Sequence, residues 1–327
     1  MIRKISTAHM SREEWLDARR HSVGGSEIGA ILGLNRYQTA LTVWSNKTGR
    51  LPDAEDNEAM RQGRDLEAYV AERFCDLTGK RVKRNNYIVK NDDFPHLHAN
   101  VDRLVIGEHA GLECKTASAY NEDKFQTDEF PDSYYAQCVS YMAVTGLPVW
   151  YLAVLVMGRA FKVYALVRAP SEFKFKKPEW CESITKVNEE EFEAIRQTVQ
   201  TFWRHVETDT PPAPDGSTTD KEALSKLYKD CDADAEVMLS KDLLREYEEA
   251  KDLLSRAEER KRSVENQIKA QMGECCTGYT DGWNVTWKPQ QRNTFDRRAY
   301  EAACGTIDKK YFKTSSTRVL RVKKMED

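Results

Sequence analysis

Hydrophobic positions recur at two different spacings along this chain, and each spacing predicts a different element. Between residues 57 and 78 the apolar positions follow helical spacing, and they are Leu66, Tyr69, Val70, Phe74 and Leu77. Residues 81–90, 98–106 and 110–117 favour consecutive strands, with turn residues between them. We therefore expect a helix followed by three strands.

The pattern then returns to helix and strand again. Residues 131–145 have helical spacing, with Pro131 at the start and Gly146 at the end. Two apolar runs, 149–157 and 160–168, are joined by Gly158-Arg159, which is typical of a hairpin. A further helix is expected over 189–208. This order predicts an α/β fold, an α+β mixed sheet flanked by helices.

Two shorter elements are expected before residue 57. Ser11 and Glu14 have the spacing of a capping box, so a helix should begin there. In the run GGSEIGAILGL, residues 24–34, a glycine turn precedes a short helix that we expect Ser26 to cap.

The Pro- and Thr-rich run 210–220 predicts a linker between two domains. Residues 1–209 would form the core, and 221–327 a C-terminal helical extension with a small β part. Over 220–272 we expect one long charged helix or a helical pair. After it, WNVTWKPQ and TRVLRVK predict two strands around a short helix at 297–304.

An apolar stripe with alternating spacings of four and three runs along the predicted C-terminal helix from Leu243 to Ile268. Lys261 interrupts it, and the run is short, so an autonomous coiled coil is not expected. The stripe would pack on its own chain or form an oligomer contact.

Composition narrows the class of protein. The 327 residues carry a net charge of −3, so there is no basic excess that would by itself indicate nucleic acid, although a local basic groove would suffice. No apolar run reaches the roughly 18 residues of a membrane helix, and the N-terminus does not resemble a secretory signal. The eight cysteines form no CxxC pair, which favours free thiols in the cytoplasm over disulfides or a structural metal cluster.

The candidate chemistry lies in ANVDRLVIGEHAGLECKTASAY, residues 99–120. Alternation along a strand places Glu113 and Lys115 on one face and Cys114 on the other. If the preceding strand pairs antiparallel across the turn, Asp102 lies beside Glu113. Two adjacent carboxylates repel each other unless a cation lies between them, and Mg²⁺ suits such oxygen ligands. Lys115 would orient water or stabilise charge on a phosphate, although a surface hairpin with a Glu–Lys pair has the same pattern.

Two polar residues on neighbouring helices could complete this site. Glu67, in the helix before the strands, is a candidate metal ligand, although a helix acid is usually solvated. Gln137, in SYYAQCVSYMAVTG, stands among residues expected in the core, so its amide needs a partner, and Lys115 is a candidate. An exposed amide would have the same local pattern.

Arg19 and Ser26 lie near the glycine turn. A guanidinium, a hydroxyl and the N–H groups at a helix start could together hold a phosphate. An ordinary helix cap would also account for Ser26.

Taken together, Trp15, Arg19 and GGS26, then Gly63xxxGlu67, then Asp102 with Glu113-Cys-Lys115, then Tyr134xxGln137 and YMAVTG resemble the lambda-exonuclease-like (YqaJ-type) phage recombination nucleases. These belong to the PD-(D/E)XK superfamily. The resemblance covers about residues 11–170, and the order and spacing of the motifs make it more specific than any one motif.

The resemblance implies a role for each matching residue. Asp102, Glu113 and the Cys114 carbonyl would bind the catalytic Mg²⁺, for which Mn²⁺ would substitute, and Glu67 would support that site. Lys115 would activate or position the attacking water, and Gln137 would orient Lys115 or the substrate. Arg19 and Ser26 would hold the 5′-terminal phosphate.

The resemblance also implies an activity and partners. Such nucleases digest one strand of linear double-stranded DNA 5′ to 3′, and they pass the 3′ overhang to a single-strand annealing protein. We therefore expect a phage or prophage protein that acts on DNA ends in the cytoplasm of a bacterial host, as a homo-oligomer. The alternatives are an endonuclease of the same superfamily and a catalytically idle module that binds DNA or a partner. His98, near these acids in sequence, is either a further metal ligand or a structural histidine.

Overall fold

The computed structural model describes residues 1–52, 56–169, 177–313 and 318–322. The chain divides into two compact units, Met1–Lys229 and Asp230–Asp327. The first unit therefore extends beyond the expected boundary at 209–221. It includes α7 (Thr218–Leu227), whose buried Asp220 accepts a hydrogen bond from the Thr39 hydroxyl at the start of α3 (Ala40–Lys47).

Within the described residues, the strands of the first unit form a larger sheet of six strands and a smaller sheet of four. The larger has the order β10-β9-β8-β7-β6-β3: Ile184–Val187, Ala160–Arg168, Val149–Val156, Ala110–Ala117, Arg103–Val105 and Val82–Arg84. The smaller has the order β1-β4-β5-β2: Ile2–Ser6, Tyr87–Asn91, Leu97–Asn100 and Val23–Gly24. Parallel pairs (β7–β8) and antiparallel pairs (β8–β9) occur together, so the predicted mixed α/β fold is confirmed.

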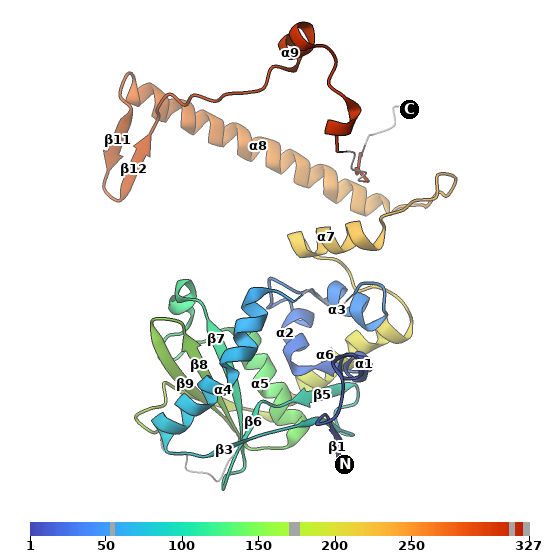
Figure 1. Ribbon diagram of the computed structural model, residues 1–327, viewed down its shortest axis with the longest axis vertical. Helices are drawn as coiled ribbons and strands as arrows, with labels where there is room; N and C mark the ends of the chain where they lie inside the picture. The colour runs from blue at the N-terminus through green and yellow to red at the C-terminus, as the bar shows by residue number, and fades with distance from the viewer. Residues whose placement is uncertain (53–55, 170–176, 314–317, 323–327) are drawn as a thin grey trace. The chain divides into compact units, whose positions relative to one another are not determined.

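Helices cover both faces of the larger sheet (Figure 1). On one face, Trp150, Leu152 and Val154 of β8 join the core that contains α5 (Asp132–Thr145) and α6 (Glu189–Glu207). On the other face, the alternate residues Tyr151 and Ala153 pack with α4 (Glu58–Thr78). Burial on both faces explains why 149–156 is a continuous apolar run.

Two of the three strands expected between 81 and 117 are divided in the structure. Residues 81–90 split into β3 and β4, and residues 98–106 split into β5 and β6. In each case the first and second halves belong to different sheets. Asp102 lies where the chain passes from the smaller sheet to the larger one, so a break in the strand positions the first candidate acid.

The N-terminal helices begin in two different ways. In α1 (Arg12–Arg20), Ser11 and Glu14 form the predicted capping box: the N–H of Ser11 donates to the Glu14 carboxylate at 2.7 Å and the N–H of Glu14 donates to the Ser11 hydroxyl at 3.2 Å. The prediction that Ser26 caps α2 (Gly25–Ile31) is wrong. Glu27 accepts the Gly24 N–H at 2.7 Å, so Gly24 is the N-cap and the Ser26 hydroxyl is released from that task.

The second unit contains α8 (Lys241–Met272), the hairpin β11–β12 (Thr277–Thr280 and Trp283–Thr286), α9 (Arg297–Cys304) and a short 3-10 turn (Lys309–Tyr311). The region 220–272 contains two helices, α7 in the first unit and α8 in the second, so it is a helical pair. The strand predicted in WNVTWKPQ is present as β12. The second strand, in TRVLRVK, is wrong for residues 318–322, which lie outside any strand, and its ends lie outside the described residues. No helix in the described part of the chain is both long and apolar enough to cross a membrane.

Candidate active site

Asp102 and Glu113 are brought together by the pairing of β6 with β7. Arg103 lies opposite Leu112, so the antiparallel register continues to Asp102 opposite Glu113. The backbone N–H of Cys114 donates to Oδ2 of Asp102 at 2.8 Å, which holds this carboxylate against β7. The two acids meet as the hairpin pattern predicted.

The Glu113 side chain is buried, with only 3% of the residue's surface exposed. Its Oε1 accepts hydrogen bonds from Nζ of Lys115 and from Nε2 of Gln137, both at 2.7 Å. Its Oε2 is also buried and has no hydrogen-bond partner among the described residues. An oxygen of this kind is costly to bury unpaired, and it would suit a cation ligand.

Gln137 is buried, as its position among core residues indicated. Its partner differs from the expected one, because Nε2 donates to Glu113 and to the Tyr141 hydroxyl, at 2.7 and 2.9 Å, rather than contacting Lys115 directly. Gln137 therefore orients the carboxylate, and it acts on Lys115 only through Glu113. Lys115 also lies over the ring of Tyr134, with Nζ 5.1 Å from the ring centroid.

The surroundings shift the pKa values of Asp102 and Lys115. Burial, followed by the neighbouring charges of Glu113 and Glu67, raises the pKa of Asp102 well above its ordinary value of 3.8. Burial lowers the pKa of Lys115, but the Glu113 carboxylate more than offsets this effect, so its pKa lies above the ordinary value and the side chain is a cation. We name Asp102, Glu113, Lys115 and Gln137 the carboxylate site.

Glu67 is held by a residue that the sequence did not single out. Nη1 of Arg103 donates to Glu67 Oε1 at 2.5 Å and to the backbone carbonyl of Asp102 at 2.8 Å. The structure thus brings two of the predicted carboxylates together and places the third on an arginine that also contacts the Asp102 backbone. Among the described residues, no three His, Cys, Asp or Glu side chains gather as a ready metal cluster.

The Cys114 side chain points to the opposite side of β7, as alternation predicted, and it packs against the core below α4. Burial, with the nearby charge of Asp102, raises the pKa of the Cys114 thiol well above its ordinary value. The thiol is therefore neutral, and its backbone is the part that faces Asp102.

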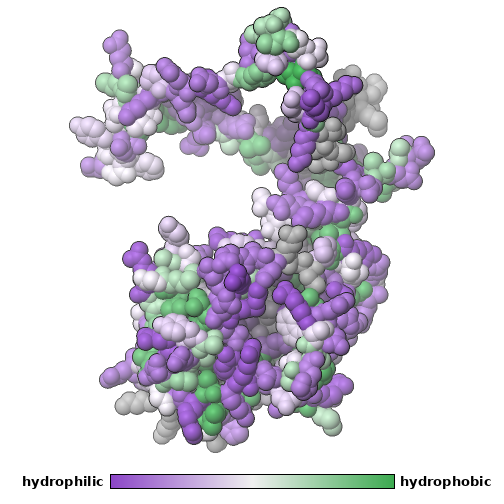
Figure 2. Space-filling view, viewed as in Figure 1, coloured by the Kyte–Doolittle hydropathy of each residue, from purple (hydrophilic) through white to green (hydrophobic). Residues whose placement is uncertain are grey.

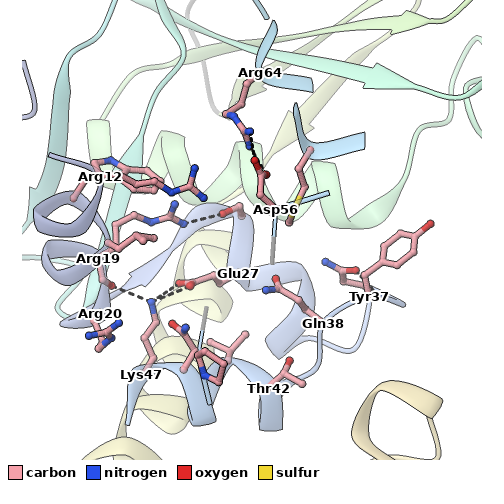
Figure 3. Close-up of a pocket in the computed structure, with 18 of the residues that line it drawn as sticks. Arg12, Arg19, Arg20, Glu27, Tyr37, Gln38, Thr42, Lys47, Asp56 and Arg64 are labelled. Carbon is pink, nitrogen blue, oxygen red and sulfur yellow. Dashed lines mark hydrogen bonds and ion pairs between the residues drawn. The ribbon is translucent and has the colours of Figure 1, made fainter. Parts of the chain in front are cut away.

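Lys115 and Gln137 line a cavity of about 1200 Å³. Trp15, Arg19 and Ser26 also line this cavity, and we name these three residues the cationic cradle. Figure 3 shows Arg19 at the cavity. Nη2 of Arg19 donates to the Ser26 hydroxyl at 3.5 Å, and the guanidinium lies over the Trp15 ring, 4.4 Å from its centroid. Two members of the carboxylate site and the whole cradle therefore line one cavity.

An ion pair between Lys47 and Glu27, which the sequence did not indicate, contacts the backbone of Arg19 in the cradle. Nζ of the buried Lys47 donates to Glu27 Oε1 at 2.9 Å and to the backbone carbonyl of Arg19 at 3.0 Å (Figure 3). The other oxygen of Glu27 caps α2 at Gly24. A glutamate three residues after a glycine cap is the only sequence signal of this support.

His98 belongs with the cradle. It is fully buried in β5, and its Nδ1 lies 2.9 Å from the Ser22 hydroxyl. A Cβ added to Gly24 would lie 3.1 Å from His98 Nε2 and 3.2 Å from Arg19 Nη2, so ring and guanidinium meet at this glycine. Burial, with the charges of Arg19, Lys47 and Lys90, holds the pKa of His98 well below 6.5. The neutral His98 ring lies next to the Arg19 guanidinium and is bonded to Ser22. These contacts favour a structural histidine over a metal ligand.

The remaining wall of the cavity is basic. Beyond the two groups already described, its cationic lining residues are Arg12, Arg20, Lys47, Arg64, Arg84 and Lys226. Two of the lining acids are paired, Asp56 with Arg64 and Glu27 with Lys47 (Figure 3). A protein with net charge −3 thus has the local basic surface that a polyanion requires.

Comparison with known proteins places the chain among recombination proteins. Residues 14–148 match the model of the YqaJ-like viral recombinase domain. The chain is 33% identical over 299 residues to the uncharacterized protein YqaJ of Bacillus subtilis (strain 168), covering 89% of this chain and 88% of that protein. Among solved structures, an alkaline exonuclease from Laribacter hongkongensis has a TM-score of 0.45 at 17% identity, over 61% of this chain and 94% of that one. A phage-related exonuclease from Haemophilus somnus has a TM-score of 0.38 at 11% identity, over 60% and 99%.

Proposed function

Because the chain belongs to the YqaJ-like viral recombinase family, we propose that it is a metal-dependent DNA nuclease of phage-type recombination. The finer proposal is a Mg²⁺-dependent 5′–3′ exonuclease that digests linear double-stranded DNA and leaves 3′ overhangs. The annealing protein that would receive these overhangs, and action in the cytoplasm of a bacterial host, complete the proposal.

The observation that carries it is the shared cavity. Lys115 and Gln137, which both contact the buried Glu113, line it together with Arg19 and Ser26, within a basic wall. A phosphodiester chain is a polyanion that must be held by cations and cleaved beside a metal, so a basic cavity next to a pair of carboxylates suits both tasks.

The donor set of the carboxylate site fits Mg²⁺. Asp102 and Glu113 would hold the ion together with the carbonyl of Cys114, and Glu113 Oε2 is a buried oxygen in need of a positive partner. When bound, the ion would polarise the phosphate and lower the pKa of a water. Glu67, fixed by Arg103, would add negative charge behind Asp102 without acting as a primary ligand.

Lys115 would act as a cation in this reaction. The Glu113 carboxylate keeps the ammonium charged, so Lys115 would orient the attacking water and stabilise the charge that grows on the phosphate, rather than accept a proton. Gln137 would hold Glu113 in the rotamer that serves both the metal and Lys115.

The cationic cradle would set the polarity of digestion. A terminal phosphate carries more negative charge than an internal phosphodiester, and it can accept hydrogen bonds from both Arg19 and Ser26. Anchoring the 5′ phosphate in the cradle would present the first phosphodiester bonds of that strand to the carboxylate site.

The test is digestion of a linear duplex labelled at one end, prepared with either a 5′ phosphate or a 5′ hydroxyl, in Mg²⁺ and in EDTA. We expect mononucleotide release from the phosphorylated 5′ end in the presence of Mg²⁺ and no release in EDTA. A covalently closed circle provides the control: cleavage of the circle would indicate an endonuclease, and no cleavage of any substrate would indicate a binding module. Release from the 3′ end would overturn the assigned polarity.

A further inference from the structure

Residues 283–313 of the second unit, which include β12 and α9, combine exposed aromatic side chains with positive charge, and we name them the aromatic–basic segment. The large aromatic side chains of the segment are 43–74% exposed, and they are Trp283, Trp287, Phe295, Tyr300, Tyr311 and Phe312. Figure 2 shows hydrophobic side chains among hydrophilic ones around α9. So many exposed rings in a short segment are typical of an interaction site.

Positive charge in this segment is only partly balanced. Its acids are Asp296, Glu301 and Asp308, and all three are engaged within the segment. Asp296 caps α9, and Glu301 lies 2.7 Å from Arg297. Asp308 lies 3.1 Å from Lys310. The other cations have no acidic partner among the described residues, and they are Lys288, Arg292, Arg298, Lys309 and Lys313.

Aromatic and cationic side chains lie together around α9. The Arg297 guanidinium lies over the Phe312 ring, 5.1 Å from its centroid, so the start of α9 and the chain after it are close to each other. The rings of Phe295 and Tyr300 have their centroids 5.3 Å apart. These contacts cover part of each ring, and much of its surface is left exposed.

The hairpin contributes two further rings on one face. Side chains alternate along a strand, so Trp283 and Trp287 lie on the same side of β12 and its extension. The N–H of Trp287 donates to the carbonyl of Cys276 at 3.0 Å, which continues the pairing of the hairpin to this residue. The two indole rings are therefore held on an ordered backbone.

The chemistry of the segment selects its ligand. Cations without acidic partners require negative charge at several points, and exposed rings require flat apolar faces. A single strand of DNA offers both, because its phosphates recur along the backbone and its bases can stack on aromatic side chains. In a duplex the bases are stacked on each other and their faces are not available. An acidic peptide has the charge but lacks the repeated flat faces.

We propose that the aromatic–basic segment binds single-stranded DNA without sequence preference, independently of the nuclease activity proposed for the first unit. The rings would stack with bases, and the cations that lack acidic partners would contact phosphates.

The first test is fluorescence anisotropy of the full chain with a labelled oligothymidylate of about 20 nucleotides, in EDTA so that no strand is cleaved. Trp283→Ala with Trp287→Ala should raise the Kd by about tenfold or more, because two stacking contacts are lost. Tyr247→Ala removes an exposed aromatic side chain of α8 and is the matched control, with an unchanged Kd. Binding of a duplex of the same length should change little in either variant. An unchanged Kd for oligothymidylate in the double variant, or equal losses for oligothymidylate and duplex, would overturn the proposal.

The salt dependence of the same binding tests the phosphate contacts. Arg292→Glu with Lys309→Glu should raise the Kd and flatten the plot of log Kd against log salt, because fewer counterions are released. Arg256→Glu with Lys269→Glu makes the same change of charge on α8 and should leave the slope as it is. Equal changes of slope in the two variants would show that net charge, rather than this segment, governs binding.

Ultraviolet cross-linking to an oligonucleotide that carries 5-iododeoxyuridine, followed by mass spectrometry, locates the strand on the chain. Cross-links should form at aromatic residues of 283–313, and cross-links confined to the first unit would reject the proposal. Digestion of a linear duplex separates this inference from the proposed function. A chain that binds oligothymidylate through the segment but digests no duplex would contradict only the nuclease, and a chain that digests duplex but loses no binding in the Trp variant would contradict only the segment.

Discussion

The carboxylate site, through Lys115 and Gln137, and the cationic cradle border the same cavity, yet they are built in opposite ways. In the carboxylate site, charge is buried and crowded: burial, the Glu113 charge and the nearby Glu67 charge all raise the pKa of Asp102. In the cradle, Arg19 borders the open cavity, rests on Trp15 and donates to Ser26. The fold holds the carboxylate site together although its acids repel each other. In the cradle, the contacts of Arg19 with Trp15 and Ser26 are favourable for a cation.

This difference indicates how strongly a bound ligand should stabilise each group: a metal ion at the carboxylate site and a phosphate at the cradle. Buried like charges are stabilised strongly by a cation between them, so the carboxylate site should respond most to metal. The cradle is screened by solvent, and each of its contacts with a phosphate is worth less. Substitutions in the two groups should therefore differ in size and in kind.

The largest effect is expected for Lys115→Ala. Without the ammonium, the charge that develops on the phosphate is not stabilised, and kcat for duplex digestion should fall by about 10²–10³-fold. Lys124→Ala, at an exposed position, is the matched control and should retain full activity. The measurement is the initial rate of nucleotide release at saturating DNA. A Lys115→Ala protein with normal kcat would remove Lys115 from the mechanism.

A smaller and more selective effect is expected for Arg19→Ala. A charge-assisted hydrogen bond contributes about 1.5–3 kcal/mol, which corresponds to a factor of roughly 10–150. The rate on 5′-phosphorylated ends should fall by this factor, while the rate on 5′-hydroxyl ends should change little. Arg159→Ala, on an exposed hairpin, serves as the control. Equal losses on both kinds of end would show that Arg19 does not recognise the terminal phosphate.

The smallest effect, of about 1–3 kcal/mol, concerns stability and is expected for Asp102→Asn. The folded-state pKa of Asp102 lies above 3.8, so the folded protein binds the extra proton more tightly than the unfolded chain. In EDTA, the free energy of unfolding should fall as pH rises from about 4 through the folded-state pKa. Asp102→Asn should remove this contribution and be the more stable protein at neutral pH.

Thermal unfolding followed by circular dichroism at several pH values measures this effect. Added Mg²⁺ should then raise the Tm of the wild-type protein but not that of Asp102→Asn, because only the former has both carboxylates to bind the ion. A Mg²⁺-induced rise of equal size in both proteins would place the metal elsewhere.

Local patterns in the sequence predicted the fold and the hairpin chemistry well. The helices at 58–78, 132–145 and 189–207 and the register that joins Asp102 to Glu113 follow from periodicity and turns alone. Periodicity does not reveal which sheet a strand joins. The breaks in 81–90 and 98–106 were therefore missed, although the second of them positions Asp102.

The supporting contacts were missed for a related reason. Arg103 binds Glu67 across 36 positions of the chain, and Lys47 binds Glu27 across 20, so neither pair has a local signature. The partner of Gln137 was misassigned because burial alone says that an amide needs a partner without saying which one. Ser26 was misassigned because two residues, Ser26 and Glu27, could each have satisfied the start of α2, and the glutamate does so.

The close contact between α2 and α5 fixes the spacing between the two groups of residues. A Cβ on Gly25 would lie 2.4 Å from the Tyr141 ring, and a Cβ on Gly29 would lie 2.9 Å from Ser133, so α2 fits against α5 only because these two positions carry no side chain. Tyr141 in turn accepts a hydrogen bond from Gln137, and Gln137 orients Glu113. For the proposed exonuclease, Gly25 and Gly29 would therefore keep the Ser26 hydroxyl at a set separation from Glu113. A larger side chain at either glycine would misalign an anchored phosphate with the bond to be cleaved, although neither glycine would contact the metal.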